Sequence, residues 1–286
     1  MRILLTNDDG YDSLGLDVLR RSLLDAGHDV WVCAPSGQRS ATSHSMTLHG
    51  DVVVTRYADR SYHCSGSPAD CILYGVKGGA VPVSPDVVIS GINHGYNLST
   101  DILYSGTVGA AREAALMGFP AMAVSAMHDD RDVYPFEAAA AFLVEHLERF
   151  LPLCDVDTLI NINVPPRPNR VWRVGNLGHL EYYDAVERCE TPSERVFDTS
   201  GTHFGVPSHL ESSVLRLKGG VAPGQSCGTV HTDFSIVAVG NIAVTALQVL
   251  PAASEQGCRA LRAMCGVSVD SDMERMERDV AGGVVR

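Results

Sequence analysis

The stretch Met1-Arg2-Ile3-Leu4-Leu5-Thr6-Asn7-Asp8-Asp9-Gly10 opens with a short apolar run and stops abruptly at polar turn residues. A continuous apolar run of this length is typical of a buried parallel strand, and such strands carry ligand sites at their carboxyl ends. Asp8 and Asp9 are adjacent carboxylates that repel each other and resist burial, and a cation is the simplest compensation. We therefore expect a divalent metal site at this edge. A plain turn is the alternative, because Asn, Asp and Gly are common turn residues.

The chain after Gly10 continues as an alternation of helix and strand. Apolar residues recur at helical spacing over 14–26, and a second apolar run follows at 29–35. Strand, helix and strand with short connections indicate a βαβ unit with parallel strands. Further strands are expected at 51–57, 61–65, 85–91, 119–125 and 158–165, and helices at 67–76, 105–115 and 136–150. Residues 1–165 are thus predicted to form a Rossmann-like α/β core with a mostly parallel sheet and flanking helices.

The character of the sequence changes after the stiff break Pro165-Pro166-Arg167-Pro168. Residues 171–235 mix short strand-like runs with Gly, Pro, Ser and His, and contain no clear helix. We expect a strand at 236–250, a short helix at 254–265 and a charged tail from 270. Residues 166–286 are therefore predicted to be a C-terminal extension, with a β-rich arm, a returning strand and a terminal helix, that serves in oligomerisation.

Composition restricts the partners of the protein. The 286 residues include 22 Lys and Arg against 34 Asp and Glu, a formal net charge of −12. Nucleic-acid polymers and anionic membranes need a basic surface, so we expect neither. No apolar run approaches membrane-spanning length, and the N-terminus does not look like a signal peptide. The eight cysteines form no Cys-x-x-Cys pair and no disulfide framework, so we expect a cytoplasmic protein.

Polar residues follow three separate strands of the expected sheet: Asp8 with Asp9, then Ser40, then Asn93 with Asn97. All of their ligand atoms are oxygens, which suits Mg²⁺, Mn²⁺ or Ca²⁺. Each has an ordinary alternative, since asparagines permit left-handed turns and serines are common in loops. Their convergence at strand ends favours a single divalent-metal site.

The segment Ser105-Gly106-Thr107 opens an Ala-rich helix. Backbone N–H groups at a helix start, together with two hydroxyls, form an anion-binding nest. Gly106 permits a close approach of the backbone. The other notable helix start, Gly66-Ser67-Pro68-Ala69-Asp70, has the pattern of a capping box, and we interpret it as structural. The metal site and the nest together indicate metal-dependent phosphomonoester hydrolysis.

Several motifs in residues 1–165 resemble the SurE family of survival proteins, which are 5'-nucleotidases. They are Thr6-Asn7-Asp8-Asp9-Gly10, Ala34-Pro35, Arg39-Ser40-Ala41, Gly66-Ser67-Pro68-Ala69-Asp70-Cys71, Ser90-Gly91-Ile92-Asn93-His94-Gly95-Tyr96-Asn97-Leu98, Tyr104-Ser105-Gly106-Thr107-Val108 and Asn161-Ile162-Asn163-Val164-Pro165. The resemblance implies a Rossmann-like sheet, one divalent ion (Mg²⁺ or Mn²⁺) and nucleoside monophosphate substrates. It also implies 3'-nucleotides or short polyphosphate as further substrates, and a homodimer or homotetramer that exchanges a C-terminal arm.

By the same resemblance, the metal ligands would be Asp8, Asp9, Ser40 and Asn93. The phosphate would be contacted by Asn97, Ser105, Gly106 and Thr107. Asp8 and Asp9 would be the catalytic residues, because either could deprotonate the attacking water at the metal.

The sequence departs from the family pattern at Ser67, where the family has Thr, and its C-terminal half matches poorly. A pathway-specific phosphatase for an unusual nucleotide is therefore an alternative. A non-catalytic nucleotide-binding regulator is another, which the presence of both Asp8 and Asp9 disfavours. A covalent mechanism of the haloacid-dehalogenase type is disfavoured because it uses an Asp-x-Asp spacing. His44 and His94 lie near the expected site, and we interpret both as surface or supporting histidines.

Overall fold

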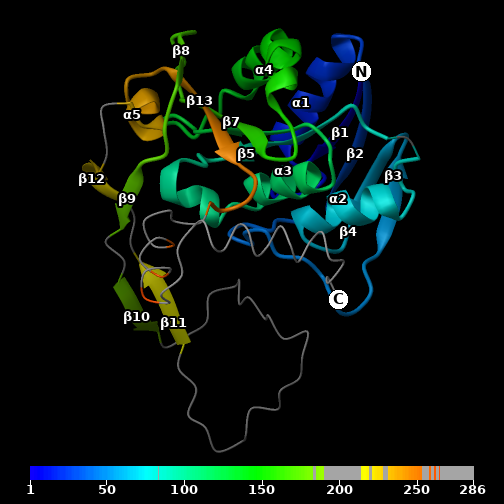
Figure 1. The fold of residues 1–286 in the computed structure, drawn as a ribbon, viewed down its shortest axis with the longest axis horizontal. Coiled ribbons are helices and arrows are strands. Elements are labelled where there is room, and N and C mark those ends of the chain that lie inside the picture. Colours follow the sequence, from blue (N-terminus) through cyan, green and yellow to red (C-terminus); the bar gives the residue numbers. More distant parts are fainter. Residues whose placement is uncertain are drawn as a thin grey trace, which may run out of the picture. The chain divides into compact units, whose positions relative to one another are not determined.

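The computed structural model describes residues 1–82, 84–182, 185–189, 214–218, 221–227 and 231–252, together with Cys258, Leu261 and Met264. By its internal contacts the chain divides into two units, Met1–Leu247 and Gln248–Arg286. The first unit contains the sheet and the helices that position the candidate site (Figure 1).

A nine-stranded sheet forms the centre of the first unit. Its order is β3 (Val54–Ala58), β4 (Ser61–Cys64), β2 (Asp29–Pro35), β1 (Arg2–Thr6), β5 (Val87–His94), β6 (Ala121–Ala126), β7 (Thr158–Val164), β13 (Ile242–Gln248) and β8 (Trp172–Val174). The strands from β4 to β7 are parallel neighbours, as are β13 and β8, whereas β3 pairs antiparallel with β4. The chain adds β2 on one side of β1 and later β5 on the other. The order therefore reverses at β1, and ligand sites of open α/β sheets lie at such a switch point.

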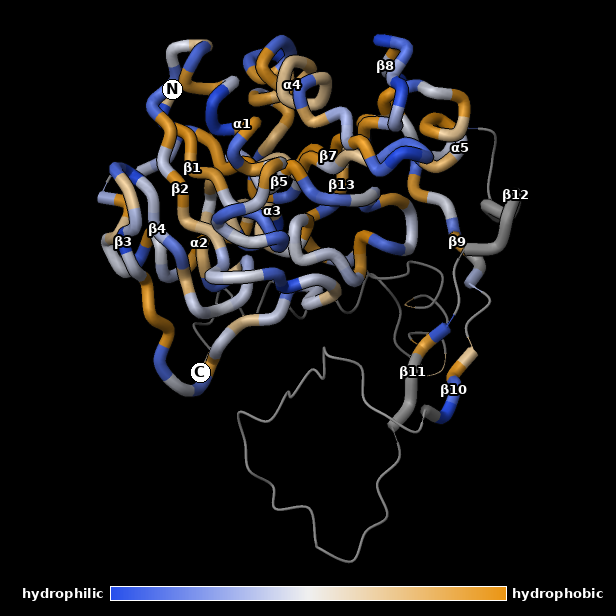
Figure 2. The backbone as a smooth tube through the Cα atoms, turned by 180° about the vertical axis from the view of Figure 1, so that it is seen from behind, coloured by the Kyte–Doolittle hydropathy of each residue, from blue (hydrophilic) through white to orange (hydrophobic). Residues whose placement is uncertain are grey.

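Helices cover both faces of this sheet. On one face α1 (Leu14–Asp25) packs beside α4 (Phe136–Phe150), and on the other α2 (Pro68–Lys77) packs beside α3 (Gly106–Leu116) (Figures 1 and 2). Between the sheet and the first helix pair lies a fully buried apolar core that includes Leu5, Leu19, Ile89 and Leu143. Burial on both faces explains why the central strands read as continuous apolar runs.

The predicted fold class is confirmed, and several elements begin and end close to the predicted residues. The expected capping box is formed: Ser67 Oγ accepts from Asp70 N at 3.1 Å, and Asp70 Oδ2 accepts from Ser67 N at 2.9 Å. The helix predicted over 136–150 has those bounds. The strands predicted at 51–57 and 61–65 correspond to β3 and β4, which pair antiparallel.

The strand predicted over 236–250 is wrong in its first part. Residues Asp233–Ala238 form helix α5, and the returning strand β13 begins only at Ile242. The same helix contradicts the expectation of no helix up to residue 235. Thr232 Oγ1 accepts from Ser235 N at 3.2 Å and caps the helix. Apolar Ile236 and Val237 suggested a strand because of their side-chain shape, but they pack into a small cluster with Leu98 and Ala243.

Beyond residue 165, two short strand pairs accompany the sheet strands β8 and β13. Strand β10 (Ala185–Cys189) pairs antiparallel with β11 (Val214–Lys218), and β12 (Val221–Cys227) with β9 (His179–Tyr182). The predicted β-rich character is thus present where the structure describes this region. The predicted tail from 270 lies outside the described residues, as does nearly all of the predicted helix at 254–265. Within the described part of the chain, no helix is both long and apolar enough to span a membrane.

Candidate active site

Asp8 lies at the carboxyl end of β1 and is held by the start of α3. The hydroxyl of Thr107 donates to Asp8 Oδ1 at 2.6 Å, and the backbone N–H of Thr107 donates to Oδ2 at 3.2 Å. The approach is close because position 106 is glycine: a Cβ there would lie 2.9 Å from Asp8 Cβ and 2.9 Å from Thr42 Oγ1. The helix therefore presents its first turn directly to the carboxylate.

Burial changes the acid strength of Asp8. Its side chain is nearly inaccessible, and burial raises its pKa to about 6, with a further increase from the charge of Asp9. The hydrogen bonds from Thr107 act in the opposite direction. Two neighbouring carboxylates with little water around them favour a bound cation, which would stabilise their ionised forms.

Asp9 is supported from the other side by His94, at the end of β5. The backbone N–H of His94 donates to Asp9 Oδ2 at 3.0 Å, and His94 Nδ1 lies 2.8 Å from the same oxygen. The contact with Asp9 raises the pKa of His94 above its usual range, against the opposing effect of burial. Tyr134 and Phe136 meet the imidazole edge-on, each at 4.9 Å between ring centroids. Both contacts use Oδ2, so Oδ1 is the oxygen that Asp9 can offer to a cation.

The loop that follows β2 carries Ser40 and lies against Asp8 and α3. The backbone N–H of Arg39 donates to the carbonyl oxygen of Asp8 at 2.6 Å. Further along the loop, His44 Nε2 lies 2.8 Å from Glu113 Oε2, a nearly buried carboxylate on α3. Ser40 itself is exposed, and its hydroxyl accepts from Gln38 Nε2 at 3.0 Å. These contacts hold Ser40 at the same edge of the sheet as Asp8.

Asn93 and Asn97 follow β5 but have different surroundings. The side-chain nitrogen of Asn93 donates to Gly95 O at 3.0 Å, so its amide oxygen is the atom that it can offer to a cation. Asn97 is buried, and its side-chain nitrogen donates to Ser125 Oγ at 2.7 Å. Its backbone N–H donates to Asn163 Oδ1 at 2.8 Å, and its carbonyl accepts from Asn163 Nδ2 at 3.0 Å.

Asn161 completes this polar network, donating to the carbonyl of Asn97 at 2.8 Å. Both asparagines of β7 belong to a motif of the family resemblance, which by itself predicts no role for them. The only sequence signal was their occurrence in an otherwise apolar strand, where buried amides require partners. The same holds for Asn7, whose side chain donates to Gly10 O at 2.9 Å and to Ser13 Oγ at 2.7 Å, fixing the turn that carries the two carboxylates.

The start of α3 differs in detail from a free anion nest. Ser105 Oγ accepts from Val108 N at 3.0 Å and caps the helix, while both donors of Thr107 point at Asp8. In this structure Thr107 thus positions a carboxylate. The phosphate contacts of Ser105, Gly106 and Thr107 stay predictions.

The donor set determines which ion would fit. Among the residues that the structure describes, no group of three or more His, Cys, Asp or Glu side chains is arranged to hold a metal. A cation at Asp8 and Asp9 would therefore need neutral oxygens as well, and Ser40 and Asn93 are the predicted donors. Such a set, with water or a substrate oxygen completing the shell, fits Mg²⁺ or Mn²⁺ better than zinc or copper.

The fold and this edge define a class: a Rossmann-like α/β protein with paired carboxylates at the switch point of its sheet, against the start of a helix. The chain belongs to the SurE family, because the family model "Survival protein SurE" matches residues 3–184.

Individual relatives agree with this assignment. The "5'-nucleotidase SurE" of Desulfitobacterium hafniense is 45% identical over 201 residues, which cover 68% of this chain and 78% of that protein. The protein of the same description from Anaeromyxobacter sp. is 39% identical over 236 residues, which cover 80% of this chain and 85% of that protein. The crystal structure of the SurE protein from Aquifex aeolicus superposes on this chain with a TM-score of 0.73 and 28% sequence identity. The match covers 92% of this chain and 99% of the Aquifex chain.

Proposed function

We propose that this protein is a metal-dependent 5'-nucleotidase, a phosphoric monoester hydrolase that acts on nucleoside monophosphates. The observation that carries the proposal is the pair Asp8 and Asp9 at the switch point of the sheet, with Asp8 hydrogen-bonded to the first turn of α3. Membership of a family whose curated members are named 5'-nucleotidase supports the reaction class.

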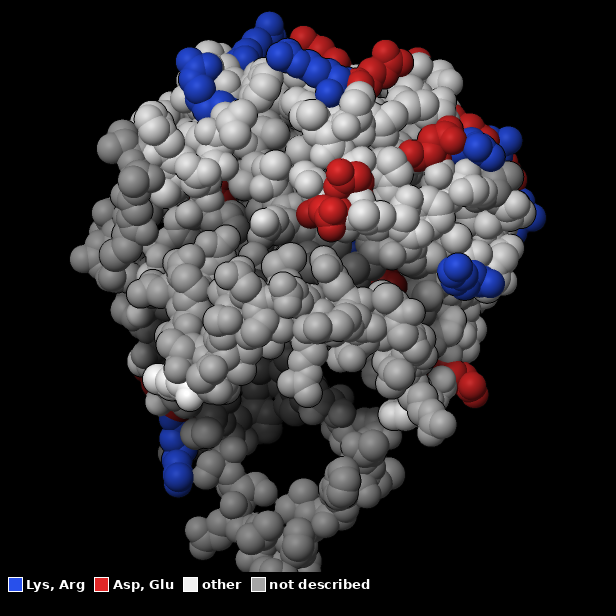
Figure 3. Space-filling model, in the orientation of Figure 1, with Lys and Arg blue, Asp and Glu red and all other residues white. Residues whose placement is uncertain are grey.

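The proposed metal site consists of Asp8, Asp9, Ser40 and Asn93, and its ion is Mg²⁺ or Mn²⁺. When bound, the ion would polarise the phosphoryl group and lower the pKa of a water molecule. Acidic and basic side chains are interspersed over the described part of the face in Figure 3. The attraction for an anionic phosphate must therefore be local, from the ion and from the start of α3.

The chain's own groups supply positioning and proton transfer. Water adds to phosphorus as the bond to the ester oxygen breaks, and the proton released by the water goes to Asp8 or Asp9. The ester oxygen takes up a proton from solvent and leaves as the hydroxyl of the nucleoside. Thr107 fixes Asp8, and His94 fixes Asp9, so the two carboxylates keep their orientation without rearrangement. Asn97, Ser105, Gly106 and Thr107 are the proposed contacts of the transferred phosphoryl group.

The oligomeric state belongs to the same proposal. We expect a homodimer or homotetramer, with the region after Pro165 supplying the exchanged arm. Light scattering coupled to size-exclusion chromatography measures this directly, and a monomer at micromolar concentration would contradict it.

The first test is phosphate release from a panel of 5'- and 3'-nucleotides and an aryl phosphate, with EDTA and after Mg²⁺ or Mn²⁺ is restored. Release that EDTA abolishes and metal restores is expected. Release from the aryl phosphate alone would indicate a specialised substrate. Folded, metal-treated protein that hydrolyses nothing would overturn the proposal in favour of a binding protein.

Asp9→Asn tests the assignment of the carboxylates, with Asp25→Asn at the exposed end of α1 as the matched control. Turnover should be lost in the first variant and kept in the second. Full turnover in Asp9→Asn would exclude Asp9 as an essential ligand or base.

A further inference from the structure

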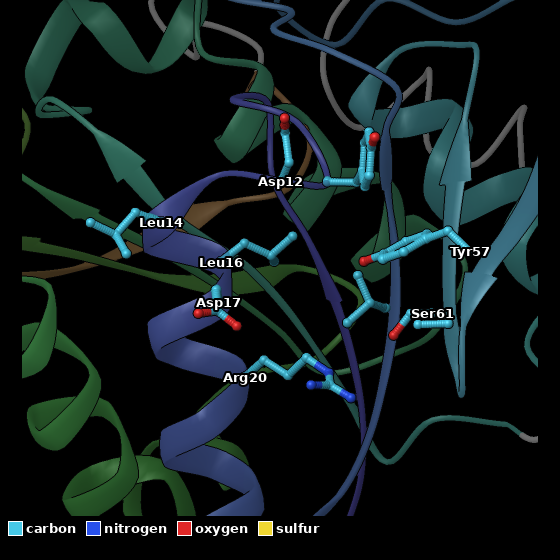
Figure 4. A pocket seen from close by; sticks show the side chains of 10 residues that line it. Asp12, Leu14, Leu16, Asp17, Arg20, Tyr57 and Ser61 are labelled. Carbon is cyan, nitrogen blue, oxygen red and sulfur yellow. The ribbon is translucent and has the colours of Figure 1, made fainter.

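A cavity of about 340 Å³ lies beside the loop that carries the two carboxylates. Its walls come from the sheet-facing side of α1 and from β2, β3 and β4, and Tyr11 and Asp12 line it from the loop after β1. In Figure 4, Arg20 enters from α1 and Tyr57 from β3, while Asp12 lies at the other end of the view from Arg20. The volume is at the small end of the range for ligand pockets, which suits a single heterocycle or nucleoside.

Aromatic rings form one side of this cavity. Tyr11 and Tyr57 lie 4.9 Å apart between ring centroids, and His63 lies 5.0 Å from Tyr11 and 6.1 Å from Tyr57. The rings are tilted by 30° to 60° rather than stacked on one another. Tyr11 and Tyr57 remain partly exposed, so their faces can receive a flat ligand ring.

The polar groups of the cavity differ at its two ends. Arg20 Nε is buried and has no hydrogen-bond partner among the described residues. Arginine only donates hydrogen bonds, so a ligand must bring acceptors to this end. Asp12 is exposed and its carboxylate only accepts, so a ligand must bring donors to that end.

The same charges argue against a phosphate in the cavity. Asp12 and Asp17 both line it, and two carboxylates repel a phosphate dianion. A neutral ring with acceptors on one edge and donors on another fits both ends. Guanine has this arrangement, with O6 and N7 accepting on one edge and the N2 amino group donating elsewhere.

We propose that this cavity binds the guanine base of the nucleotide substrate, against the cavity-facing sides of Tyr11 and Tyr57, with its O6 and N7 edge toward Arg20. This inference rests on the proposed nucleotidase function. The cavity is linked to the two carboxylates through the loop after β1, because Tyr11 is separated from Asp9 only by Gly10. The backbone N–H of Tyr11 donates to Pro35 O at 2.9 Å, and this hydrogen bond fixes Tyr11 beside the carboxylates. In the proposed pose, the sugar and phosphate of the nucleotide extend from the Tyr11 end of the cavity along the loop that carries Asp8 and Asp9.

The test compares GMP, AMP, UMP, CMP and p-nitrophenyl phosphate as substrates of the full-length, metal-loaded protein. In the wild type, kcat/KM should be at least about tenfold higher for GMP than for UMP or CMP. Arg20→Met should lower the ratio of kcat/KM for GMP to that for AMP by about tenfold, through KM rather than kcat. Tyr11→Leu should lower kcat/KM for both purine nucleotides relative to the aryl phosphate.

Arg173→Met is the matched control, because Arg173 is exposed on β8 and does not line the cavity, and its guanidinium donates to the carbonyl of Trp172 at 3.0 Å. Thermal melting verifies that each variant is folded. Equal effects of Arg20→Met on all substrates would overturn the proposal, and so would the absence of any purine preference. GMP that inhibits AMP hydrolysis non-competitively would also overturn it, because the cavity would then be an effector site. Failure of the proposed function has a different signature, since no substrate would then release phosphate.

Discussion

The hydrogen bond from Thr107 to Asp8 should control how tightly the protein holds its metal ion. Thr107 is fully buried, and its hydroxyl lies 2.6 Å from Asp8 Oδ1. Thr107→Val keeps the shape of the side chain and the backbone N–H but removes this donor. A hydrogen bond to a charged group contributes about 1.5–3 kcal/mol, and at 1.4 kcal/mol per tenfold change this corresponds to roughly 10- to 150-fold. Because the ionised form of Asp8 loses this support, we expect the Kd for Mn²⁺ or Mg²⁺ to rise by roughly 10- to 100-fold.

Two assays measure this effect independently. Titration of metal into EDTA-treated protein, followed by phosphate release, gives the apparent Kd, and kcat at saturating metal should change less than the Kd does. The metal-induced increase in melting temperature reports binding without any turnover. Thr107→Ser keeps the hydroxyl and is the control, expected to remain within about threefold of the wild type if it keeps the charge-assisted bond. Unchanged metal affinity in Thr107→Val would refute the reasoning, and equal impairment in Thr107→Ser would attribute the effect to packing.

Two other contacts can be tested in the same way. Glu113→Ala and His44→Ala should each lower kcat/KM by roughly tenfold, because each releases the Ser40 loop from α3. The double variant should have the same kcat/KM as a single variant. Additive losses in the double variant would contradict the pairing of these two residues. Asp101 has a pKa raised to about 6 by burial and by the charge of Asp233, and Tyr182 donates a hydrogen bond to it. An acid whose pKa is raised by folding stabilises the fold below its ordinary pKa of 3.8, and this contribution is lost as the pH rises through 6. The difference in the free energy of unfolding between Asp101→Asn and the wild type, measured by urea unfolding, should therefore favour the variant more at pH 7 than at pH 4. An equal difference at both pH values would contradict this.

The local signals in the sequence were sufficient for most of the core. The helix over 136–150 has a strong apolar repeat, and the capping box at Ser67 and Asp70 involves atoms only three residues apart. Such features depend on neighbouring residues and are therefore readable from the sequence. The short helix α5 was missed because its position depends on a distant packing partner, Leu98, rather than on a helical repeat.

The sequence by itself determined the fold class, the family and the edge of the sheet where the carboxylates lie. Only the tertiary structure decided what surrounds them. Thr107 is 99 residues from Asp8, His94 is 85 from Asp9, and neither partner can be paired from spacing along the chain. The cavity beside Tyr11 likewise exists only because α1 and the strands β2, β3 and β4 together enclose it. Sequence patterns record which residues are buried or polar, whereas the distances between their atoms arise when separate strands and helices pack.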